Sequence, residues 1–463
     1  MTTDTLEKGR VPVLVWSTLG FTPMFAVWLM FGVPGIPIRE EFGLSDVQLA
    51  WITAVAVLNG AIWRLPAGIA ADRFGGKRVF VTMLAVTAIP AYLVSTATSF
   101  TTLLFYAFLV GFAGNSFSVG IAWVSAWWPQ NRQGFSLGVF GAGNVGASVT
   151  KFIGPALIVA VPAAGYLGGV VPGGWRFVPF LYMVLLIAMA IGMWAFTPHR
   201  EIKPGSGRSM KSMLAPLKQT RVWRFSLYYV VVFGAYVALA AWLPKYYVDV
   251  YGMPLSQAAL LTAIFIFPAS LLRPVGGWMS DRIGARKVMY ICFSIMLVAS
   301  GILMMPYGHI VLANPNGTTS EILPWQVGTI LFTLLVFLMG CAMGIGKAAV
   351  YKHIPVYYPG RVGAVGGIVG LIGGLGGFIL PITFGVLNDV IGVWTSCFML
   401  MFIIVAVSLA WMHAAIREME KQAHPELATP RDLPELEALK LPKAKTGKAA
   451  KLLGVAPAGP RAR

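Results

Sequence analysis

Twelve long apolar runs divide this chain and restrict the folds open to it. Of its 463 residues, 57% are hydrophobic and only 11% are charged. A run of about 20 apolar residues is long enough to cross a bilayer as a helix. We therefore predict an all-α membrane protein with twelve transmembrane helices. Their approximate limits are 12–35, 48–71, 79–97, 102–128, 134–161, 176–197, 225–244, 255–280, 287–306, 325–352, 361–387 and 391–415.

The Lys and Arg residues between the runs indicate the orientation. The loops after the second, fourth, sixth, eighth and tenth runs are basic, and the intervening loops are poor in Lys and Arg. The longest basic loop, 198–224, has Glu201 as its only acid. Basic loops of membrane proteins face the cytoplasm, so we expect both termini on that side. The net charge of +18 is explained by these loops and the tail, and nucleic-acid binding is not expected.

An internal repeat organises the runs into two sets of six. Arg64 lies eight residues before Asp72, and Arg273 lies eight residues before Asp281, in the second run of each set. Secondary transporters are commonly built from such duplicated halves. We divide the chain into an N-terminal half at 1–197, a basic linker at 198–224, a C-terminal half at 225–415 and a tail at 416–463 expected to be disordered.

Arg64 and Arg273 lie deep in their runs. At about 1.5 Å per residue, each is roughly 12 Å inside the aspartate that ends the run, near the middle of a bilayer. A charge there costs at least about 2.5–3.5 kcal/mol. One interpretation is an arginine bonded to helix carbonyls. Since no Asp or Glu lies deep in any run, we predict instead a shared anion site, because the guanidinium fork matches a planar oxyanion.

Two kinds of segment are predicted to control the change of conformation during transport. They are the ends of these two runs and two glycine-rich runs. Asp and Arg at a helix end can pair with neighbouring helices in one conformation, and glycine lets helices approach closely and bend. The loops Gly-x-x-x-Asp-Arg-x-Gly resemble the signature loop of the major facilitator superfamily at both expected positions. We therefore assign gating roles to six residues: Asp72, Arg73, Asp281, Arg282, Gly143 and Gly374.

The arginine in the second run of each half and the glycine-rich fifth and eleventh runs also resemble the nitrate/nitrite porter family. This resemblance implies that Arg64 and Arg273 bind nitrate between the halves. It further implies that three aromatic residues flank the anion and that a signature asparagine lies near it: Phe117, Tyr229, Phe233 and Asn144. As sequence alone, an aromatic residue in a span is more often a packing residue.

Intramembrane lysines separate branches of that family. Lys151 and Lys347 stand in the glycine-rich signatures where the nitrite-exchanging branch has uncharged polar residues, so the resemblance is closer to the proton-linked branch. A desolvated lysine beside other cations can titrate near neutrality, and its replacement by glutamine is expected to shift transport toward exchange. Lys352 and His353 are weaker candidates. The alternative is that these lysines only make the cavity more positive.

We therefore expect a monomeric, proton-linked nitrate importer of a bacterial inner membrane that works by alternating access. Nitrate/nitrite exchange is the main alternative, followed by a small-carboxylate carrier and a membrane sensor that binds an anion. An enzyme is not expected, because the sequence has no His/Cys metal cluster, phosphate loop or nucleophile–base pair. The expected partners are nitrate or nitrite, protons and the lipid bilayer, with no cofactor and no metal. Cys292, Cys341 and Cys397 lie in apolar runs and are predicted to be free thiols.

Overall fold

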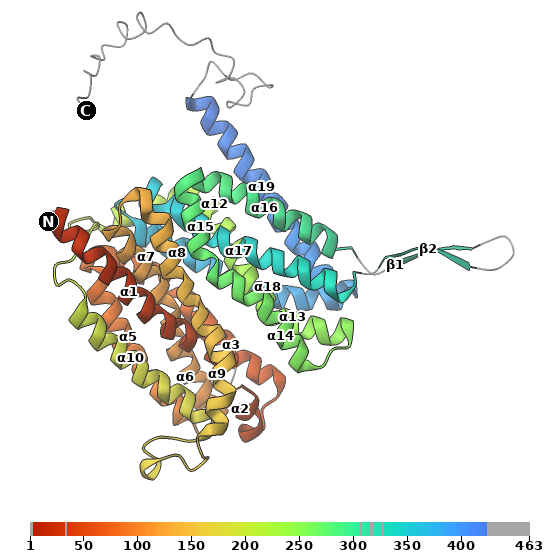
Figure 1. The fold of residues 1–463 in the computed structure, drawn as a ribbon, viewed down its shortest axis with the longest axis horizontal. Coiled ribbons are helices and arrows are strands. Elements are labelled where there is room, and N and C mark those ends of the chain that lie inside the picture. Colours follow the sequence, from red (N-terminus) through yellow and green to blue (C-terminus); the bar gives the residue numbers. More distant parts are fainter. Residues whose placement is uncertain (1–2, 33–34, 306–307, 314–318, 326, 424–463) are drawn as a thin grey trace, which may run out of the picture. The chain divides into compact units, whose positions relative to one another are not determined.

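The computed structural model describes residues 3–32, 35–305, 308–313, 319–325 and 327–423 (Figure 1). The chain forms one large unit, Met1–Leu409, and a second unit, Ala410–Arg463. The described residues of the first unit are mostly helical and include one hairpin. Helix α19 continues to Ala423, beyond the expected end of the last span, and the rest of the predicted tail lies outside the described residues.

The bounds of the α-helices, in chain order, are α1 (Thr3–Trp28), α2 (Gly35–Phe42), α3 (Asp46–Ile62), α4 (Arg64–Phe74), α5 (Gly76–Ser95), α6 (Phe100–Val110), α7 (Ser116–Trp127), α8 (Gln133–Gly141), α9 (Val145–Ala160), α10 (Phe177–Phe196), α11 (Met210–Leu214), α12 (Thr220–Tyr229), α13 (Ala235–Tyr251), α14 (Leu255–Leu271), α15 (Arg273–Met279), α16 (Ala285–Leu303), α17 (Thr329–Tyr357), α18 (Val362–Ile391) and α19 (Ser396–Ala423). Tighter or wider helical turns occur at η1 (Met30–Gly32), η2 (Gly111–Asn115), η3 (Gln130–Arg132), η4 (Ala142–Asn144), η5 (Leu167–Gly169), η6 (Gly174–Arg176), η7 (Ala215–Lys218), η8 (Val230–Gly234) and η9 (Ser280–Gly284).

Eleven helical runs in the described part of the chain are long and apolar enough to cross a membrane. The all-helical fold class is therefore confirmed, but the expected span at 255–280 is divided differently. Its first part is the shorter apolar helix α14, and its second part, α15, continues through the wide turn η9 into α16. Arg273–Leu303 consequently forms a single long run.

The sequence analysis did not predict the hairpin that precedes α17. Strands β1 (Gly308–Ala313) and β2 (Thr319–Trp325) pair antiparallel, with Gly308 opposite Trp325 and Ala313 opposite Thr319. The register shifts between Ile310 and Val311. These strands lie in a segment that was expected only to connect two spans, and Figure 1 shows them leading away from the helices.

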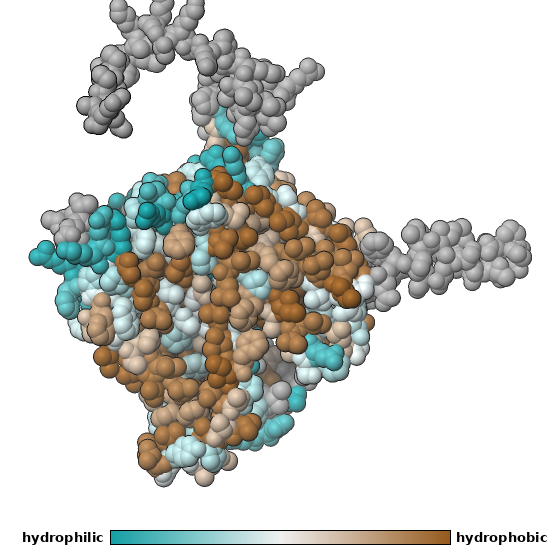
Figure 2. Space-filling view, in the orientation of Figure 1, coloured by the Kyte–Doolittle hydropathy of each residue, from teal (hydrophilic) through white to brown (hydrophobic). Residues whose placement is uncertain are grey.

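The surface of the helices is apolar over a broad band, and hydrophilic residues gather at one end of them (Figure 2). The exposed apolar side chains include Ile191, Val298, Ile330 and Val407 on four different helices. Such a large continuous apolar surface is typical of contact with lipid rather than water.

The two sequence repeats have matching backbone breaks. Trp63 separates α3 from α4 with φ −85° and ψ 2°, and Leu272 separates α14 from α15 with φ −81° and ψ 1°. Each break is followed directly by an arginine, Arg64 or Arg273. The breaks therefore place both arginines at the first position of a short helix.

Glycines at the ends of these short helices also match. Gly75 has φ 100° and ψ 143°, and Gly284 has φ 87° and ψ 139°, a conformation that glycine adopts readily and other residues rarely do. Each glycine lies three residues after an aspartate, Asp72 or Asp281. The repeated motif therefore has the same backbone turn at both positions.

Each short helix packs against a glycine-rich helix of the other repeat. A Cβ atom on Gly68 of α4 would lie 2.0 Å from the carbonyl oxygen of Gly363 in α18. Likewise, a Cβ atom on Gly277 of α15 would lie 2.0 Å from the carbonyl oxygen of Gly134 in α8. Only glycine permits these backbone approaches, so the helices are in contact here without intervening side chains.

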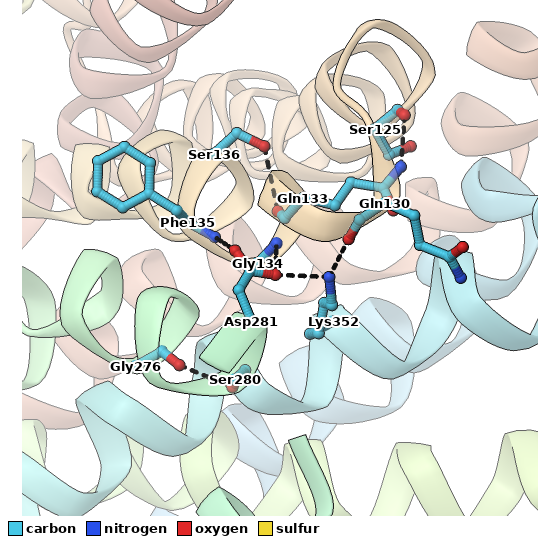
Figure 3. Close-up of polar contacts among 10 residues, drawn as sticks. All are labelled: Ser125, Gln130, Gln133, Gly134, Phe135, Ser136, Gly276, Ser280, Asp281 and Lys352. Carbon is cyan, nitrogen blue, oxygen red and sulfur yellow. Dashed lines mark hydrogen bonds and ion pairs between the residues drawn. The ribbon is translucent and has the colours of Figure 1, made fainter. Parts of the chain in front are cut away.

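The two aspartates cap helices of the opposite repeat. Asp281 accepts hydrogen bonds from the backbone N–H groups of Gly134, at 2.9 Å, and Phe135, at 2.8 Å, in the first turn of α8 (Figure 3). Asp72 accepts from the N–H of Ala364, at 3.2 Å, in the first turn of α18. Neither α8 nor α18 has a side-chain cap of its own. A carboxylate at this position satisfies free N–H donors and complements the helix dipole.

Candidate functional site

Arg64 is buried, with 1% of its surface exposed. Its Nε donates a hydrogen bond to the carbonyl oxygen of Gly60, and its Nη1 donates to that of Gly370 in α18, each at 2.8 Å. These bonds agree in part with the carbonyl-bonded interpretation of the sequence. They use two of the five N–H donors of the guanidinium. Its central carbon lies 5.0 Å from the ring centre of Trp28 and 5.3 Å from that of Phe233.

Arg273 is buried to the same degree but is held differently. Its Nε and Nη1 have no hydrogen-bond partner among the described residues. The guanidinium lies against α8, since a Cβ atom on Gly141 would be 2.4 Å from Nε. Neither Arg273 nor Arg64 forms an ion pair with a carboxylate in the described part of the chain. A buried cation without an anionic partner costs several kcal/mol, so the arrangement favours a bound anion.

The guanidinium groups of both arginines lie near the Phe117 ring. The guanidinium carbon of Arg273 is 5.0 Å from its centre and that of Arg64 is 5.9 Å from it. Tyr229 stacks on Phe233, with ring centres 4.9 Å apart and 9° between planes, and Phe117 is nearly parallel to Tyr229 at 6.3 Å. The structure therefore brings the three expected aromatic residues together with both arginines, and their faces attract cations.

Asn144 and Lys347 belong to the same buried region. Asn144 lies in η4, three residues after Gly141, and neither atom of its side-chain amide has a partner among the described residues. Lys347 in α17 is fully buried, and its ammonium donates to the carbonyl oxygen of Ala269 at 3.1 Å. The same nitrogen lies 3.1 Å from the ring centre of Tyr236 and 5.8 Å from that of Phe233. Lys347 is therefore a third buried basic side chain beside the arginines.

A cavity of about 440 Å³ lies on the side of these residues away from the capping aspartates. Its walls come from the turn after α1 with η1 and from α3, α9, α13, α14 and α18, and Tyr236, Ser148 and Lys151 are among its polar lining residues. Lys151 is exposed to this cavity, whereas Lys347 is buried behind Tyr236. The structure thus separates the two lysines that the sequence analysis grouped together.

Lys352 and His353 lie near the C-terminal end of α17, away from Arg64 and Arg273. The Nζ of Lys352 is 2.5 Å from Oδ1 of Asp281 and also donates to the carbonyl oxygen of Gln130 (Figure 3). The Nδ1 of His353 donates to the carbonyl oxygen of Ala349 at 2.8 Å, and its ring lies 5.2 Å from that of Phe225. Lys352 is consequently part of the contact between repeats, and neither residue joins the arginine cluster.

Of the remaining predicted gating residues, the two arginines are exposed and the two glycines are packed between helices. Arg73 and Arg282 are exposed and lie over aromatic rings of their own segments, Phe74 at 5.9 Å and Trp278 at 4.7 Å. Gly374 is at the site, since its Cβ would be 3.6 Å from the Arg64 guanidinium carbon.

Gly143 is also in close packing, but against α1. A Cβ atom on Gly143 would lie 2.6 Å from the Phe21 ring. Both predicted glycines therefore stand where a larger side chain would collide with a neighbouring helix.

Sequence reasoning missed three aromatic residues of the cluster. Trp28 lies over Arg64 and donates from Nε1 to the carbonyl oxygen of Ala56 at 3.0 Å. The ring centre of Tyr351 lies 4.9 Å from those of Phe117 and Tyr229, with the rings nearly perpendicular. Tyr236 and Tyr351 could have been found by helical spacing, because they follow Phe233 by three residues and Lys347 by four. Trp28 has no comparable signal.

Comparison with known proteins places this geometry in a class. Residues 15–308 and 251–453 match the Major Facilitator Superfamily. The fold resembles FucP in its outward conformation, with a TM-score of 0.65 and 18% identity over 87% of this chain and 98% of that one. It also resembles the human organic anion transporter MFSD10, with a TM-score of 0.67 and 13% identity over 87% and 99%. The chain belongs to the major facilitator superfamily, a class of membrane transporters.

Its sequence relatives narrow the class to the nitrate/nitrite porter family, as the sequence analysis predicted. The chain is 64% identical over 420 residues to the probable nitrate/nitrite antiporter NarK1 of Thermus thermophilus, covering 90% of this chain and 95% of that protein. It is 28% identical to the nitrite extrusion protein of Bacillus subtilis (strain 168), covering 86% and 93%. It is 30% identical to the probable nitrate transporter NarT of Staphylococcus carnosus (strain TM300), covering 88% and 96%. The chain is a multi-pass membrane transporter and not an enzyme.

Proposed function

We propose that this chain exchanges nitrate for nitrite across a bacterial inner membrane by alternating access. The observation that carries the proposal is that two buried arginines contact one aromatic ring, while Nε and Nη1 of Arg273 have no partner among the described residues. A small oxyanion between Arg64 and Arg273 would supply the missing acceptors. Both nitrate and nitrite are planar and carry a single negative charge, which matches the fork of a guanidinium.

The aromatic residues favour a flat anion over a bulky one. Phe117, Tyr229 and Phe233 are stacked or nearly parallel, so they offer flat surfaces beside the arginines. The side-chain amide of Asn144 has no partner among the described residues, and its NH2 group can donate a hydrogen bond to one oxygen atom of the anion. A carboxylate larger than formate would carry an aliphatic group beside its oxygen atoms and needs more room than a nitrate ion.

The contacts of Asp72 and Asp281 support an alternating-access cycle. They join α4 to α18 and α15 to α8 at the end of the helices that carries the basic loops, while the cavity opens at the other end. In the proposed cycle, an anion enters through the cavity and reaches the arginines, and the capping contacts then separate. The orientation assigned from the basic loops makes this an outward-facing state.

Exchange is preferred here to the proton symport that the sequence analysis expected. That expectation depended on Lys151 and Lys347, whereas the relative that is 64% identical is named an antiporter. Exchange of two monovalent anions moves no net charge. It therefore avoids the roughly 2.3 kcal/mol per 100 mV that a single anion would need against an inside-negative potential.

Reconstitution of the full chain into liposomes tests the proposal. We expect external nitrate to enter vesicles loaded with nitrite and not vesicles loaded with an impermeant anion such as gluconate. A pH gradient imposed without internal nitrite should give no uptake. Uptake that follows external acidification and ignores internal nitrite would instead establish proton symport.

A further inference from the structure

A line of polar side chains connects the cavity to Arg273 along one face of the segment α8–η4–α9. Gly141 touches the Arg273 guanidinium, and Asn144, Ser148 and Lys151 follow it at intervals of three, four and three residues. These intervals return to the same side of a helix, and the ten residues from Gly141 to Lys151 span about 15 Å. The line therefore runs from the arginine to the cavity that Ser148 and Lys151 line.

Two buried side chains on this line lack partners among the described residues. Both amide atoms of Asn144 and the hydroxyl of Ser148 form no hydrogen bond, although only 1% and 3% of these residues are exposed. A serine or threonine in an apolar helix ordinarily bonds to the carbonyl one turn earlier, as Thr150 does to Gly146 at 2.9 Å. Ser148 does not, so its hydroxyl remains available to a ligand in the cavity.

Lys151 is the sole charged residue among those that line the cavity. In the described part of the chain it forms no ion pair and no hydrogen bond, and its side chain is exposed to the cavity. The other lining residues are mostly apolar, for example Val57, Ile266 and Pro381. A single cation in apolar surroundings attracts anions strongly, because the walls screen its field less than water does.

The opposite repeat has no such line. The contacts of Gly134, Gly138 and Gly141 with one repeat match those of Gly363, Gly367 and Gly370 with the other. In that register, the positions of Asn144, Ser148 and Lys151 correspond to Gly373, Gly377 and Leu380 of α18. Helix α18 therefore packs against the other repeat without such polar groups. This indicates that Asn144, Ser148 and Lys151 have a role other than helix packing.

We propose that Lys151 and Ser148 form a second, outer binding position for nitrate, from which the anion passes by Asn144 to the arginine pair. This inference rests on the proposed transport of nitrate and adds an entry site to it. Lysine suits a brief contact, because its ammonium is a compact charge on a flexible stem and lacks the two-pronged grip of arginine. Lys151 is thus an anion-recruiting residue, in place of the proton-coupling role predicted from sequence.

Transport kinetics test the role of Lys151. Protein reconstituted in one orientation with nitrite inside is given nitrate on the cavity side. Lys151→Gln should raise the KM for nitrate about tenfold, the loss of one charge-assisted contact, while the maximal rate stays near that of wild type. Lys151→Arg should keep most of the affinity, and Ser148→Ala should raise the KM less. Lys245→Gln is the matched control, since Lys245 is exposed between Trp242 and Trp394 and does not line the cavity.

Amine modification tests the same position without transport. In purified full-length protein, nitrate should slow the reaction of Lys151 with an amine-reactive reagent, read by mass spectrometry, and gluconate should not. Lys245 should react equally with and without nitrate. The protection should persist in Arg273→Lys, whose inner site is weakened. An unchanged KM in Lys151→Gln, or a lack of nitrate protection, would overturn the outer position. Failure of wild-type exchange alone would overturn only the proposed function, because the modification result stands independently.

Discussion

The ammonium nitrogen of Lys352 lies 2.5 Å from Oδ1 of Asp281, and the two residues together hold the first turn of α8 (Figure 3). Asp281 accepts from two backbone N–H groups of that turn, while Lys352 donates to the carbonyl oxygen of Gln130 just before it. The Asp281 carboxylate thus accepts hydrogen bonds from α8 of the other repeat and forms an ion pair with Lys352 of its own repeat. Asp72 makes the equivalent cap on α18 without a lysine in such an ion pair among the described residues.

We predict strong coupling between Asp281 and Lys352. Asp281→Asn and Lys352→Gln should each lower the free energy of unfolding by about 3 kcal/mol, since both side chains are less than a tenth exposed and each substitution leaves the other partner unpaired. The double variant should lose less than the sum, with a coupling of about 1–3 kcal/mol. Thermal and denaturant unfolding in detergent measures this. Arg282→Gln, at an exposed position, is the control, and strictly additive losses would exclude the coupling.

The two arginines should respond differently to replacement by lysine. Arg273→Lys should weaken nitrate binding by about 10- to 150-fold with little loss of stability, because its Nε and Nη1 bind no described residue and one charge-assisted bond is worth about 1.5–3 kcal/mol. Arg64→Lys should weaken binding and also destabilise the fold, since Arg64 bonds to Gly60 and Gly370. Nitrate-dependent thermal shifts read both properties. Equal effects on stability would show that the assignment of free donors is wrong.

A bulky residue at Gly374 should block transport. A Cβ atom there would lie 2.9 Å from the Cβ of Ala61 and 3.6 Å from the Arg64 guanidinium carbon, so Gly374→Leu would displace helix α3 or the arginine. Gly385→Leu on the same helix is the matched control, because its Cβ would meet only Trp242, at 4.0 Å. Exchange rates per folded transporter, with expression measured separately, decide the matter. Normal exchange by Gly374→Leu would mean that Ala61 and Arg64 move aside without loss of transport.

A matching test applies to Gly143 on the other repeat. Gly143→Leu should also block exchange, because its Cβ would lie 2.6 Å from the Phe21 ring and 3.2 Å from Oγ1 of Thr22 in α1. Gly301→Leu provides the control, since its nearest atom is on the Phe402 side chain at 3.3 Å. The same exchange assay applies, and a fully active Gly143→Leu protein would show that α1 yields to the larger side chain.

The arginines were predictable from sequence, but their partners were not. The identical spacing of Arg64 to Asp72 and of Arg273 to Asp281 marks both helices, and the structure gives them the same breaks and turns. The aromatic residues required the family resemblance, because a phenylalanine in an apolar run has no distinguishing pattern. The contact of Lys352 with Asp281 joins residues 71 positions apart and depends on helix packing. Only the folded chain determines such pairs.

Depth along a helix separates the two lysines that the sequence pattern grouped together. Lys151 and Lys347 both lie in glycine-rich runs, so their composition is alike. Lys151 is ten residues beyond the level of Arg273 on its helix, however, and therefore reaches the cavity. Lys347 stays beside the arginines, because α17 brings it against Ala269 and Tyr236. Counting residues from Gly141 would have separated the two only if the contact of Gly141 with Arg273 were known.

The last prediction concerns why exchange would be obligatory. Lys347 and Arg64 both lie within 6 Å of the Phe233 ring centre, and Arg273 lies over the neighbouring Phe117 ring. With Lys347 protonated and no anion bound, these three buried cations repel one another, and closing the site around them is costly. A bound anion offsets one of the charges. We therefore expect the empty transporter to change sides slowly, which would force nitrate entry to wait for nitrite exit.

Removing the charge of Lys347 should relax this requirement. In Lys347→Gln, the empty site holds two cations instead of three, so we expect at least about tenfold more nitrate uptake into vesicles without internal nitrite than in wild type, corresponding to about 1.4 kcal/mol. Lys347→Arg keeps the charge and should still require internal nitrite. The ratio of uptake with and without internal nitrite measures the effect at fixed pH. If Lys347→Gln depends on internal nitrite as strictly as wild type does, the third positive charge is not what prevents the empty transporter from returning.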